Sequence, residues 1–347
     1  MVTMKEIAKR AGVSISTVSL VMNHRDAGRV KPAIAAHVRE IAEQLGYQVN
    51  PMASSLRTNR TRTIGFISEE VATTPYAGGM ILGAQSAASQ LGYLLITVST
   101  DGGMDEDDEI DALKRYGADG FLYAKMSNRV TALPDRLKDE PVVLVDATDA
   151  AGVISSIEPD EYRIGYDATK RLIDAGCTRI AYVGCSEPMI AQAGRLAGYR
   201  AAIEESGRKP DDRLVIDVLN NGPALETVSD LFDWEHPDGF FCFNDARAWY
   251  VYECAARRGL TIGRDVSVVG VDNHRVFAET LSPQLTTVEL PHFEMGYWAA
   301  AKLISLIEKR DLADLAVPAT TAPMPPLDAP VPAKVHCTLI EKESVQA

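Results

Sequence analysis

The chain has 347 residues, of which 46% are hydrophobic, and a formal net charge of −13 at pH 7. This length exceeds one typical domain, and the apolar content is sufficient for a sizeable buried core. No leading stretch resembles a signal peptide and no run approaches about 18 apolar residues, so we expect a cytoplasmic protein without a membrane span. The five cysteines lack Cys-x-x-Cys spacing and the six histidines are dispersed, so we expect no disulfide, metal site or cofactor.

The first residues predict two short helices joined by a tight turn. Thr3 and Glu6 form a Thr-x-x-Glu capping box, and Gly12 suits the left-handed conformation that ends a helix. Ser14 is a favoured N-cap for a second helix. Apolar residues recur at helical spacing in both segments, at Met4, Ile7, Ala8 and Ala11 and then at Val18, Val21 and Met22. This arrangement is typical of a helix-turn-helix.

A third helical pattern follows, with Pro32 early in the helix and Gly46 as its stop. Its apolar residues are Ile34, Val38, Ile41, Ala42 and Leu45. A generic three-helix bundle without a role in nucleic-acid binding is one interpretation, but the charge favours DNA. Residues 1–62 hold ten Lys or Arg against four Asp or Glu, a net charge of +6, whereas the rest of the chain carries −19. A basic head on an acidic body is typical of a DNA-binding module fused to another domain.

The same residues resemble the headpiece of the lactose/galactose repressor family. The family pattern Val-Ser-x-x-Thr-Val-Ser with a closing Asn is matched by Val13, Ser14, Thr17, Val18, Ser19 and Asn23. The match continues through Leu45-Gly46-Tyr47, Asn50-Pro51-x-Ala53-x-Ser55-Leu56-Arg57-Thr58 and Thr63-Ile64-Gly65. The resemblance implies a helix-turn-helix headpiece at residues 1–48, a hinge helix and linker at 49–62, and a two-lobed core for effector binding and dimerisation at 63–340.

The resemblance also implies which headpiece residues contact duplex DNA. They are Thr3, Ser14, Ile15, Ser16, Thr17, Leu20 and Asn23. The second helix enters the major groove with Ile15, Ser16 and Leu20 toward the bases, while the other positions contact phosphates. Many relatives have arginine where this chain has Leu20, and leucine offers only an apolar contact, for instance to a thymine methyl group. As alternatives, Ile15 packs in the core and Ser16 is simply solvated.

Residues 50–57 have a cap residue, a proline at the first helical position and only about two turns, too short for a stable isolated helix. In the family, the equivalent segment folds as a hinge helix when paired across a dimer in the minor groove, where a leucine wedges between base steps. The residues on this segment that the resemblance assigns to DNA are Asn50, Ala53, Leu56 and Arg57, with Leu56 as the wedge. The alternative is a flexible linker whose Leu56 packs on the core. Ser54 stands where many members carry arginine.

From residue 63 onward, apolar β-branched runs alternate with helical patterns. Strands are predicted at 63–67, 94–98, 120–123, 142–145, 180–183, 239–243 and 266–271, and helices at 79–91, 106–116, 161–175, 196–206, 245–258 and 292–309. This alternation predicts a doubly wound α/β fold with parallel sheets. The resemblance implies two such lobes, like those of periplasmic binding proteins, with crossovers near Glu158, Pro291 and a proline-rich segment, 318–332. We expect that segment to be irregular.

Polar residues follow five of the apolar runs, at the carboxyl ends of strands, where ligands bind in open α/β sheets. They are Ser68, Tyr123, Asp146, Asn244 and Asp272. Each singly could equally be a turn or cap residue. Family motifs are matched at Thr74-Pro75-Tyr76 with Gly83, at Arg195-Leu-Ala-Gly-Tyr199, at Phe243-Asn244-Asp245 and at Ser267-Val-Val-Gly-Val-Asp272. The resemblance thereby implies effector contacts for Asp146, Arg195, Asn244 and Asp272.

The chemistry of these residues suits a hydroxylated effector. Carboxylates accept hydrogen bonds from vicinal hydroxyls, and arginine donates a planar fork. Tyr76, which the resemblance places beside the effector, or Trp249 could stack on an apolar sugar face, although Trp249 could instead fill core volume. We expect a sugar or sugar derivative, with a nucleobase or a sugar acid as alternatives.

The sequence therefore predicts a DNA-binding transcriptional regulator, most consistent with a repressor, acting as a homodimer on a pseudo-palindromic operator whose affinity the effector controls. One competitor is a sugar-binding protein of a transport system with the same core fold. The other is an α/β enzyme, but the sequence lacks Gly-x-Ser-x-Gly, P-loop, Gly-x-Gly-x-x-Gly and His-Glu-x-x-His motifs, so we assign no catalytic residues. The acidic run 105–109 is interpreted as a solvated helix start.

Overall fold

The computed structural model describes residues 2–23, 25–47, 60–69, 71–72, 74, 77–100, 106–219, 221–312 and 315–346. The chain divides into two compact units, Met1–Thr61 and Arg62–Ala347. Each unit has its own buried apolar core.

The first unit contains the expected helices α1 (Met4–Ala11), α2 (Ile15–Met22) and α3 (Pro32–Gln44). The capping box at the start of α1 is confirmed, because the Glu6 backbone N–H donates to Thr3 Oγ1 over 3.3 Å and the Thr3 N–H donates to Glu6 Oε2 over 2.8 Å. Gly12 ends the helix at φ 63°, in the left-handed region. Ser14 caps α2 by accepting from the Thr17 N–H over 3.1 Å.

The core of this unit lies between the three helices. Ile7, Val18, Val21 and Val38 are fully buried there. Ile34, an apolar residue of the pattern that predicted this helix, is 38% exposed, and Ala35 is buried instead. The buried face of α3 is centred on Val38 and includes Ala35, three residues before it, and Ala42, four residues after it. Ile34 lies at the margin of this face.

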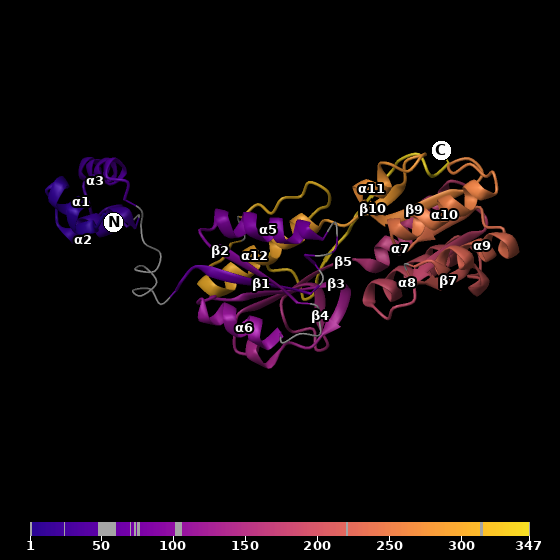
Figure 1. Cartoon of the computed structure of the whole chain (residues 1–347), viewed down its shortest axis with the longest axis horizontal. Helices are drawn as coiled ribbons and strands as arrows, with labels where there is room; N and C mark the ends of the chain where they lie inside the picture. Colours follow the sequence, from indigo (N-terminus) through magenta and orange to yellow (C-terminus); the bar gives the residue numbers. More distant parts are fainter. Residues whose placement is uncertain are drawn as a thin grey trace. The chain divides into compact units, whose positions relative to one another are not determined.

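The second unit holds two sheets, each with helices on both faces (Figure 1). The first sheet is entirely parallel and has the order β11-β5-β4-β3-β1-β2. Its strands are β1 (Thr63–Glu69), β2 (Leu94–Thr100), β3 (Phe121–Thr131), β4 (Val142–Asp149), β5 (Ser156–Pro159) and β11 (Ala333–Val335). Helices α5 (Gly78–Gln90) and α12 (His292–Glu308) cover one face, and α6 (Glu106–Arg115) with the short helix η1 (Asp135–Leu137) covers the other. We call this the first lobe.

The second sheet, in the second lobe, has the order β12-β10-β9-β8-β6-β7. Its strands are β6 (Ile180–Cys185), β7 (Val215–Val218), β8 (Gly239–Cys242), β9 (Ser267–Asp272), β10 (Thr286–Glu289) and β12 (Thr338–Ile340). The last pairs antiparallel with β10, and the other pairs are parallel. Helices α7 (Glu161–Asp174) and α8 (Ile190–Glu205) lie on one face, and α9 (Pro223–Glu235) and α10 (Asp245–Arg257) on the other. Two short helices, η2 (Asp212–Leu214) and α11 (Arg275–Ala278), complete it.

The seven predicted strands and six predicted helices are all present, with corrected ends. Helix α8 begins at Ile190 rather than at residue 196, and β3 continues to Thr131 rather than ending at residue 123. The extension of β3 follows a shift of register between Ala124 and Arg129, which an apolar pattern does not encode. Short strands such as β7 and β11, of four and three residues, and helix α9 were not predicted.

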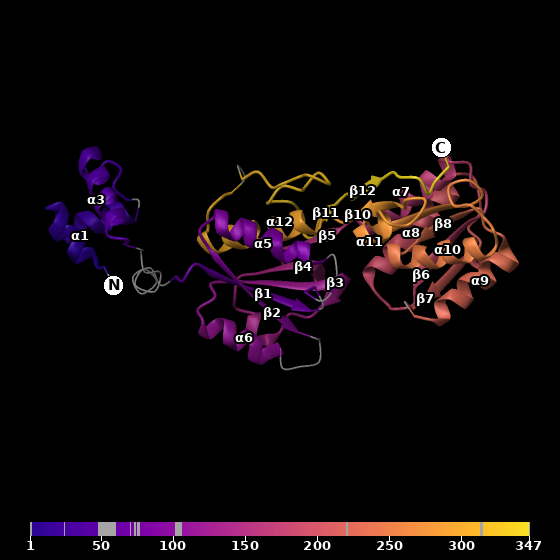
Figure 2. The same cartoon turned by 45° about the horizontal axis from the view of Figure 1, so that its top comes forward.

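The chain crosses between the lobes three times. Two crossings lie where expected, between β5 and α7 and between β10 and α12. The third lies at 336–337, between β11 and β12, just beyond the proline-rich segment. That segment contains neither helix nor strand, as expected, and it runs back along α12 (Figure 2). The Trp298 indole N–H donates to the Pro325 carbonyl over 2.9 Å, and Leu327 is buried in the core of the first lobe.

Close helix packing depends on glycine in both lobes. Helices α5 and α12 lie side by side (Figures 1 and 2), and a methyl group on Gly83 would lie 1.8 Å from the Phe293 carbonyl oxygen. In the second lobe, a methyl group on Gly165 of α7 would lie 2.0 Å from the Arg195 carbonyl oxygen of α8. The backbones therefore approach more closely than any larger residue permits.

Candidate DNA interface and effector cleft

The first residues of α2 present an exposed face. Val18 and Val21 hold the other face of the helix in the core, while Ser14 and Ser16 are exposed. Ile15 is 50% exposed, which excludes the alternative that it packs in the core. Leu20 is half-buried one turn further along. An exposed isoleucine at the start of a helix is available for contact with another molecule.

Polar groups flank this face. Ser14 Oγ and Thr17 Oγ1 lie 2.9 Å apart, and the Asn23 amide donates to the Ser19 carbonyl over 2.6 Å. Thr3 Oγ1 contacts Glu6 Oε2 at 3.1 Å. Asn50, Ala53, Leu56 and Arg57, expected to contact DNA, and Tyr76, expected to contact the effector, lie outside the described residues.

Four predicted effector residues meet in one cleft of the second unit. The hollow there has a volume of about 40 Å³, and the predicted residues among its lining are Asp146, Arg195, Asn244 and Asp272. The other lining residues are Met126, Ser127, Glu161, Phe243, Leu290 and His292. Asp146 and Ser127 belong to the first lobe, whereas Arg195 and Asn244 belong to the second, so the cleft is shared between the two.

Strand ends and helix starts position these side chains. Asp146 lies near the carboxyl end of β4 at φ 52°, and Asp272 ends β9 at φ 112°. Non-glycine residues at positive φ are costly and are retained mainly at functional sites. Asn244 follows β8 as the N-cap of α10, where its side-chain oxygen accepts from the Arg247 N–H over 3.1 Å.

Arg195 is held from three sides. Its Nε donates to Glu161 Oε2 over 2.7 Å, and its Nη1 donates to the Phe243 carbonyl over 2.5 Å. The guanidinium carbon lies 4.4 Å from the centre of the Phe243 ring, a cation–π distance. Burial lowers the pKa of Arg195, but Glu161 and Asp272 raise it above its usual value. Arg195 therefore stays charged.

Burial shifts the protonation of two other cleft residues. It raises the pKa of the Asp146 carboxyl to about 7, and the charge of Glu161 acts in the same direction. Burial, together with the charge of Arg195, lowers the pKa of His292 to about 4, so that this imidazole is neutral near pH 7. Burial also raises the pKa of Glu161, against the effect of Arg195.

Three other predicted effector residues lie apart from the lining of this hollow. Ser68 is buried and its hydroxyl accepts from the Ala72 N–H over 3.1 Å. The Tyr123 hydroxyl donates to the Glu106 carboxylate on the α6 side of the sheet. Trp249 is 41% exposed and packs edge-on against Tyr250, so it does not fill core volume. Their roles remain predictions.

Residues missed in the sequence include Glu161 and His292, which each begin a helix immediately after a crossover. The crossovers predicted near Glu158 and Pro291 could have identified these two residues, because a chain that passes between two lobes borders the cleft between them. Ser127 carried no such signal, since it lies in the irregular part of β3.

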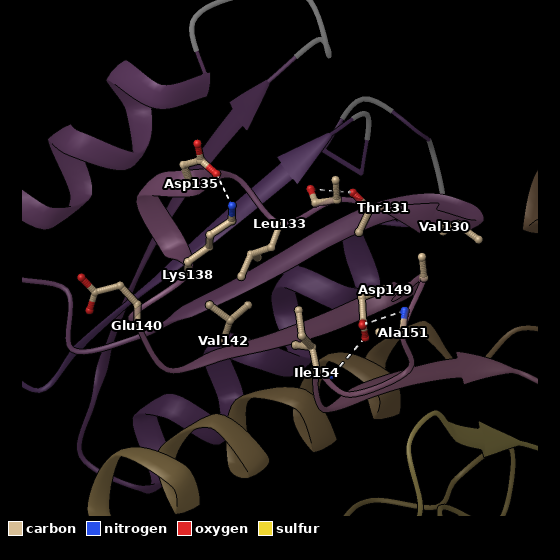
Figure 3. Close-up of a pocket in the computed structure, with 12 residues that line it drawn as sticks. Val130, Thr131, Leu133, Asp135, Lys138, Glu140, Val142, Asp149, Ala151 and Ile154 are labelled. Atoms are coloured by element: carbon tan, nitrogen blue, oxygen red, sulfur yellow. Dashed lines mark hydrogen bonds and ion pairs between the residues drawn. The ribbon is translucent and has the colours of Figure 1, made fainter.

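A larger hollow of about 730 Å³ lies elsewhere in the first lobe, between the ends of β3 and β4 (Figure 3). Its polar groups already have partners. Asp135 pairs with Lys138, and the Asp149 carboxylate accepts from backbone N–H groups of its own turn, including that of Ala151 over 3.2 Å (Figure 3). A ligand site needs convergent polar groups that are available to it, and the interlobe cleft fits that requirement better.

Within the described residues, none of the helices is long and apolar enough to cross a membrane.

Comparisons with known proteins identify families that match both units of the chain. Residues 3–50 match the bacterial regulatory proteins of the lacI family, and residues 61–323 match the periplasmic binding proteins and sugar binding domain of the LacI family. The HTH-type transcriptional regulator RegA of Clostridium saccharobutylicum is 32% identical over 89% of this chain and 94% of its own length. The HTH-type transcriptional repressor PurR of Vibrio atlanticus (strain LGP32) is 31% identical over 90% of this chain and 93% of its own.

Solved structures agree with this assignment. The transcriptional regulator CelR in complex with cellobiose has a TM-score of 0.67 and 26% identity, and covers 99% of this chain and 100% of that one. The lac repressor dimer bound to operator shares the fold, with a TM-score of 0.74 at 19% identity over 100% and 99% of the two chains. The lacI-type match over residues 3–50 favours a regulator over the transport protein considered from the sequence. The chain belongs to the LacI family of DNA-binding transcriptional regulators, with a headpiece that binds DNA and a core of the sugar-binding type.

Proposed function

We propose that this protein represses transcription in the cytoplasm as a homodimer on a pseudo-palindromic operator, and that a sugar or sugar derivative bound in the interlobe cleft sets its operator affinity. The observation that carries the effector assignment is the convergence of Asp146, Arg195, Asn244 and Asp272 from both lobes on one cleft. A ligand held by both lobes couples their closure to its own binding, which is the condition for allosteric control.

Supporting arguments come from chemistry and from a relative. Buried carboxylates and a buried arginine are suited to hydroxyl groups, and one regulator of similar fold and 26% identity was solved with cellobiose. The homodimer follows from recognition geometry, because one headpiece reads one half-site of an operator. The hinge residues Asn50, Ala53, Leu56 and Arg57 complete the proposed DNA contacts.

The DNA part is tested by fluorescence anisotropy of the full chain on genomic fragments. We expect tight binding that weakens steeply with salt, since Lys and Arg release counterions from DNA. Ile15→Ala should lower operator affinity by roughly tenfold, at about 1.4 kcal/mol. Ile34→Ala is the matched control, because Ile34 is also an exposed headpiece isoleucine but lies on α3. Equal affinity for both variants would contradict the placement of α2 in the groove.

A further inference from the structure

The charges that line the cleft are unequal. Three of its lining residues are carboxylic acids, Asp146, Glu161 and Asp272, and one is a guanidinium, Arg195. The remaining titratable group, His292, is neutral near pH 7 because burial lowers its pKa. Burial raises the pKa of Asp146 to about 7, so this carboxyl is only part-ionised near neutral pH. A carboxylate or phosphate group that entered this cleft would still meet more carboxyl groups than cations, in a region of low dielectric where like charges repel strongly.

The arginine of the cleft is already engaged. It pairs with Glu161 at 2.7 Å, donates to the Phe243 carbonyl and lies over the Phe243 ring. An acidic ligand would have to compete with Glu161 for it. Three further cations act on this region from its edge. Lys334 Nζ lies 3.8 Å from Glu158 Oε1 and is 54% exposed, Lys342 donates to Asn273, and the buried Arg247 already donates to Asn244 Oδ1 over 3.1 Å.

The helix ends at the cleft are also supplied with negative charge. Helix α7 starts at Glu161 and is capped by Asp160, whose carboxylate accepts from the Arg163 N–H over 3.1 Å. Helix α10 is capped by Asn244 and has the fully buried Asp245 in its first turn. These residues satisfy the positive ends of the α7 and α10 dipoles, and helix α12, which begins at the cleft residue His292, has the buried Glu294 in its first turn.

Beside Asp146 lies a group of buried polar atoms that lack partners. The buried atoms without a hydrogen bond among the described residues include Oδ1 of Asn128, Oδ1 of Asp146 and Oγ of Ser156, while the Asn128 side chain stabilises the neighbouring Glu158 carboxylate. Strands β4 and β5 pair up to Val145 and Ile157, directly before Asp146 and Glu158, and the Asn128 N–H stabilises the Asp146 carboxylate. Asn128 is fully buried, and its backbone has the left-handed conformation, with φ 47°.

Unsatisfied buried donors and acceptors cost free energy, and a group that both donates and accepts removes that cost. Hydroxyl groups do so without bringing charge. We infer that the effector is an uncharged, hydroxyl-rich molecule anchored in the first lobe by Asn128 and Asp146, and that the cleft rejects its carboxylated and phosphorylated analogues. This inference rests on the proposed function. The hollow of about 40 Å³ is far below the roughly 300 Å³ of a small ligand pocket, so the lobes part to admit the effector.

The test is a matched series on the full-length protein, read by thermal shift and by calorimetric titration. The neutral probes are D-glucose, D-galactose, D-xylose, sucrose and cellobiose, and the acidic probes are D-glucuronate, D-galacturonate and D-glucose 6-phosphate. We expect at least one neutral sugar to raise the Tm and its acidic analogue to bind at least ~10-fold more weakly. Tighter binding of the acidic analogue would overturn the inference and leave the proposed function intact. If no probe of either kind bound, the sugar assignment itself would fail.

The anchoring residue is tested separately. Asn128→Ala should lower the affinity for the neutral sugar by about 10-fold, because one or two hydrogen bonds are lost. It should not change the operator affinity in the absence of sugar. Thr100→Val is the control, because Thr100 Oγ1 is another buried polar atom without a partner among the described residues but lies on β2. Unchanged sugar affinity in Asn128→Ala would refute the anchor. If Asn128→Ala does not fold, the charge series on the unmodified protein still decides the rejection of acids.

Discussion

Replacing Asp146 by asparagine should stabilise the protein, and increasingly so as the pH rises. Burial raises the pKa of this carboxyl from 3.8 to about 7 in the folded protein. Between these values the folded state holds a proton that the unfolded state has lost, so the free energy of unfolding falls as the pH rises from about 4 to 7. A shift of roughly three pH units corresponds to at most about 4 kcal/mol. Asparagine has nearly the same shape, cannot ionise, and tolerates the positive φ of this position.

The assay is urea unfolding of wild type and Asp146→Asn at several pH values between 4 and 8. The stability difference should be near zero at pH 4 and reach a few kcal/mol at pH 8. Asp245, whose pKa burial also raises to about 7, contributes equally to both proteins and cancels in the difference. The control is Asp135→Asn. Lys138 lowers the pKa of the exposed Asp135 carboxyl, so this aspartate stabilises the folded protein more as the pH rises. Its replacement by asparagine should therefore become more destabilising with rising pH, the opposite of the trend for Asp146→Asn. A difference for Asp146→Asn that did not vary with pH would refute the reasoning.

Other substitutions test packing, pairing and DNA recognition. Gly165→Ala should destabilise the core by about 1–3 kcal/mol in urea, because its methyl group would lie 2.0 Å from the Arg195 carbonyl, whereas Gly78→Ala, with open space around it, should be nearly neutral. Glu161→Gln should lower the unfolding free energy by about 3 kcal/mol, since Arg195 would keep a buried charge without its counter-ion; a loss below 1 kcal/mol would contradict that. Leu20→Arg should shift operator selection toward guanine by about 1–3 kcal/mol, measured by selection from random duplexes, and an unaltered consensus would place Leu20 away from the bases.

Much of the fold and part of the site were predictable from the sequence because they follow from local patterns. The capping box at Thr3, the stop at Gly12 and the apolar strands each depend on neighbouring residues alone. The convergence of Asp146 and Asp272 in one cleft follows from their position at strand ends, where the sheet topology brings them together.

The remainder depends on long-range packing. A strand end does not reveal which face a side chain takes, and Tyr123 turned to the α6 face to meet Glu106. The shift of register in β3 that places Ser127 and Asn128 beside Asp146 requires three neighbouring strands to be known first. Ile15 was predicted to face the DNA, with the core as the alternative, and the packing of the three helices shows that it is 50% exposed.

The measurement that tests the central claim most directly is the operator affinity of the full-length chain, determined by anisotropy with and without a saturating neutral sugar identified by thermal shift. The account predicts specific binding to a genomic fragment and a change in Kd of at least ~10-fold when the sugar is added, which corresponds to a coupling free energy above about 1.4 kcal/mol. Failure to bind any genomic fragment even at low salt, or a Kd that is the same with the cleft saturated, would contradict it.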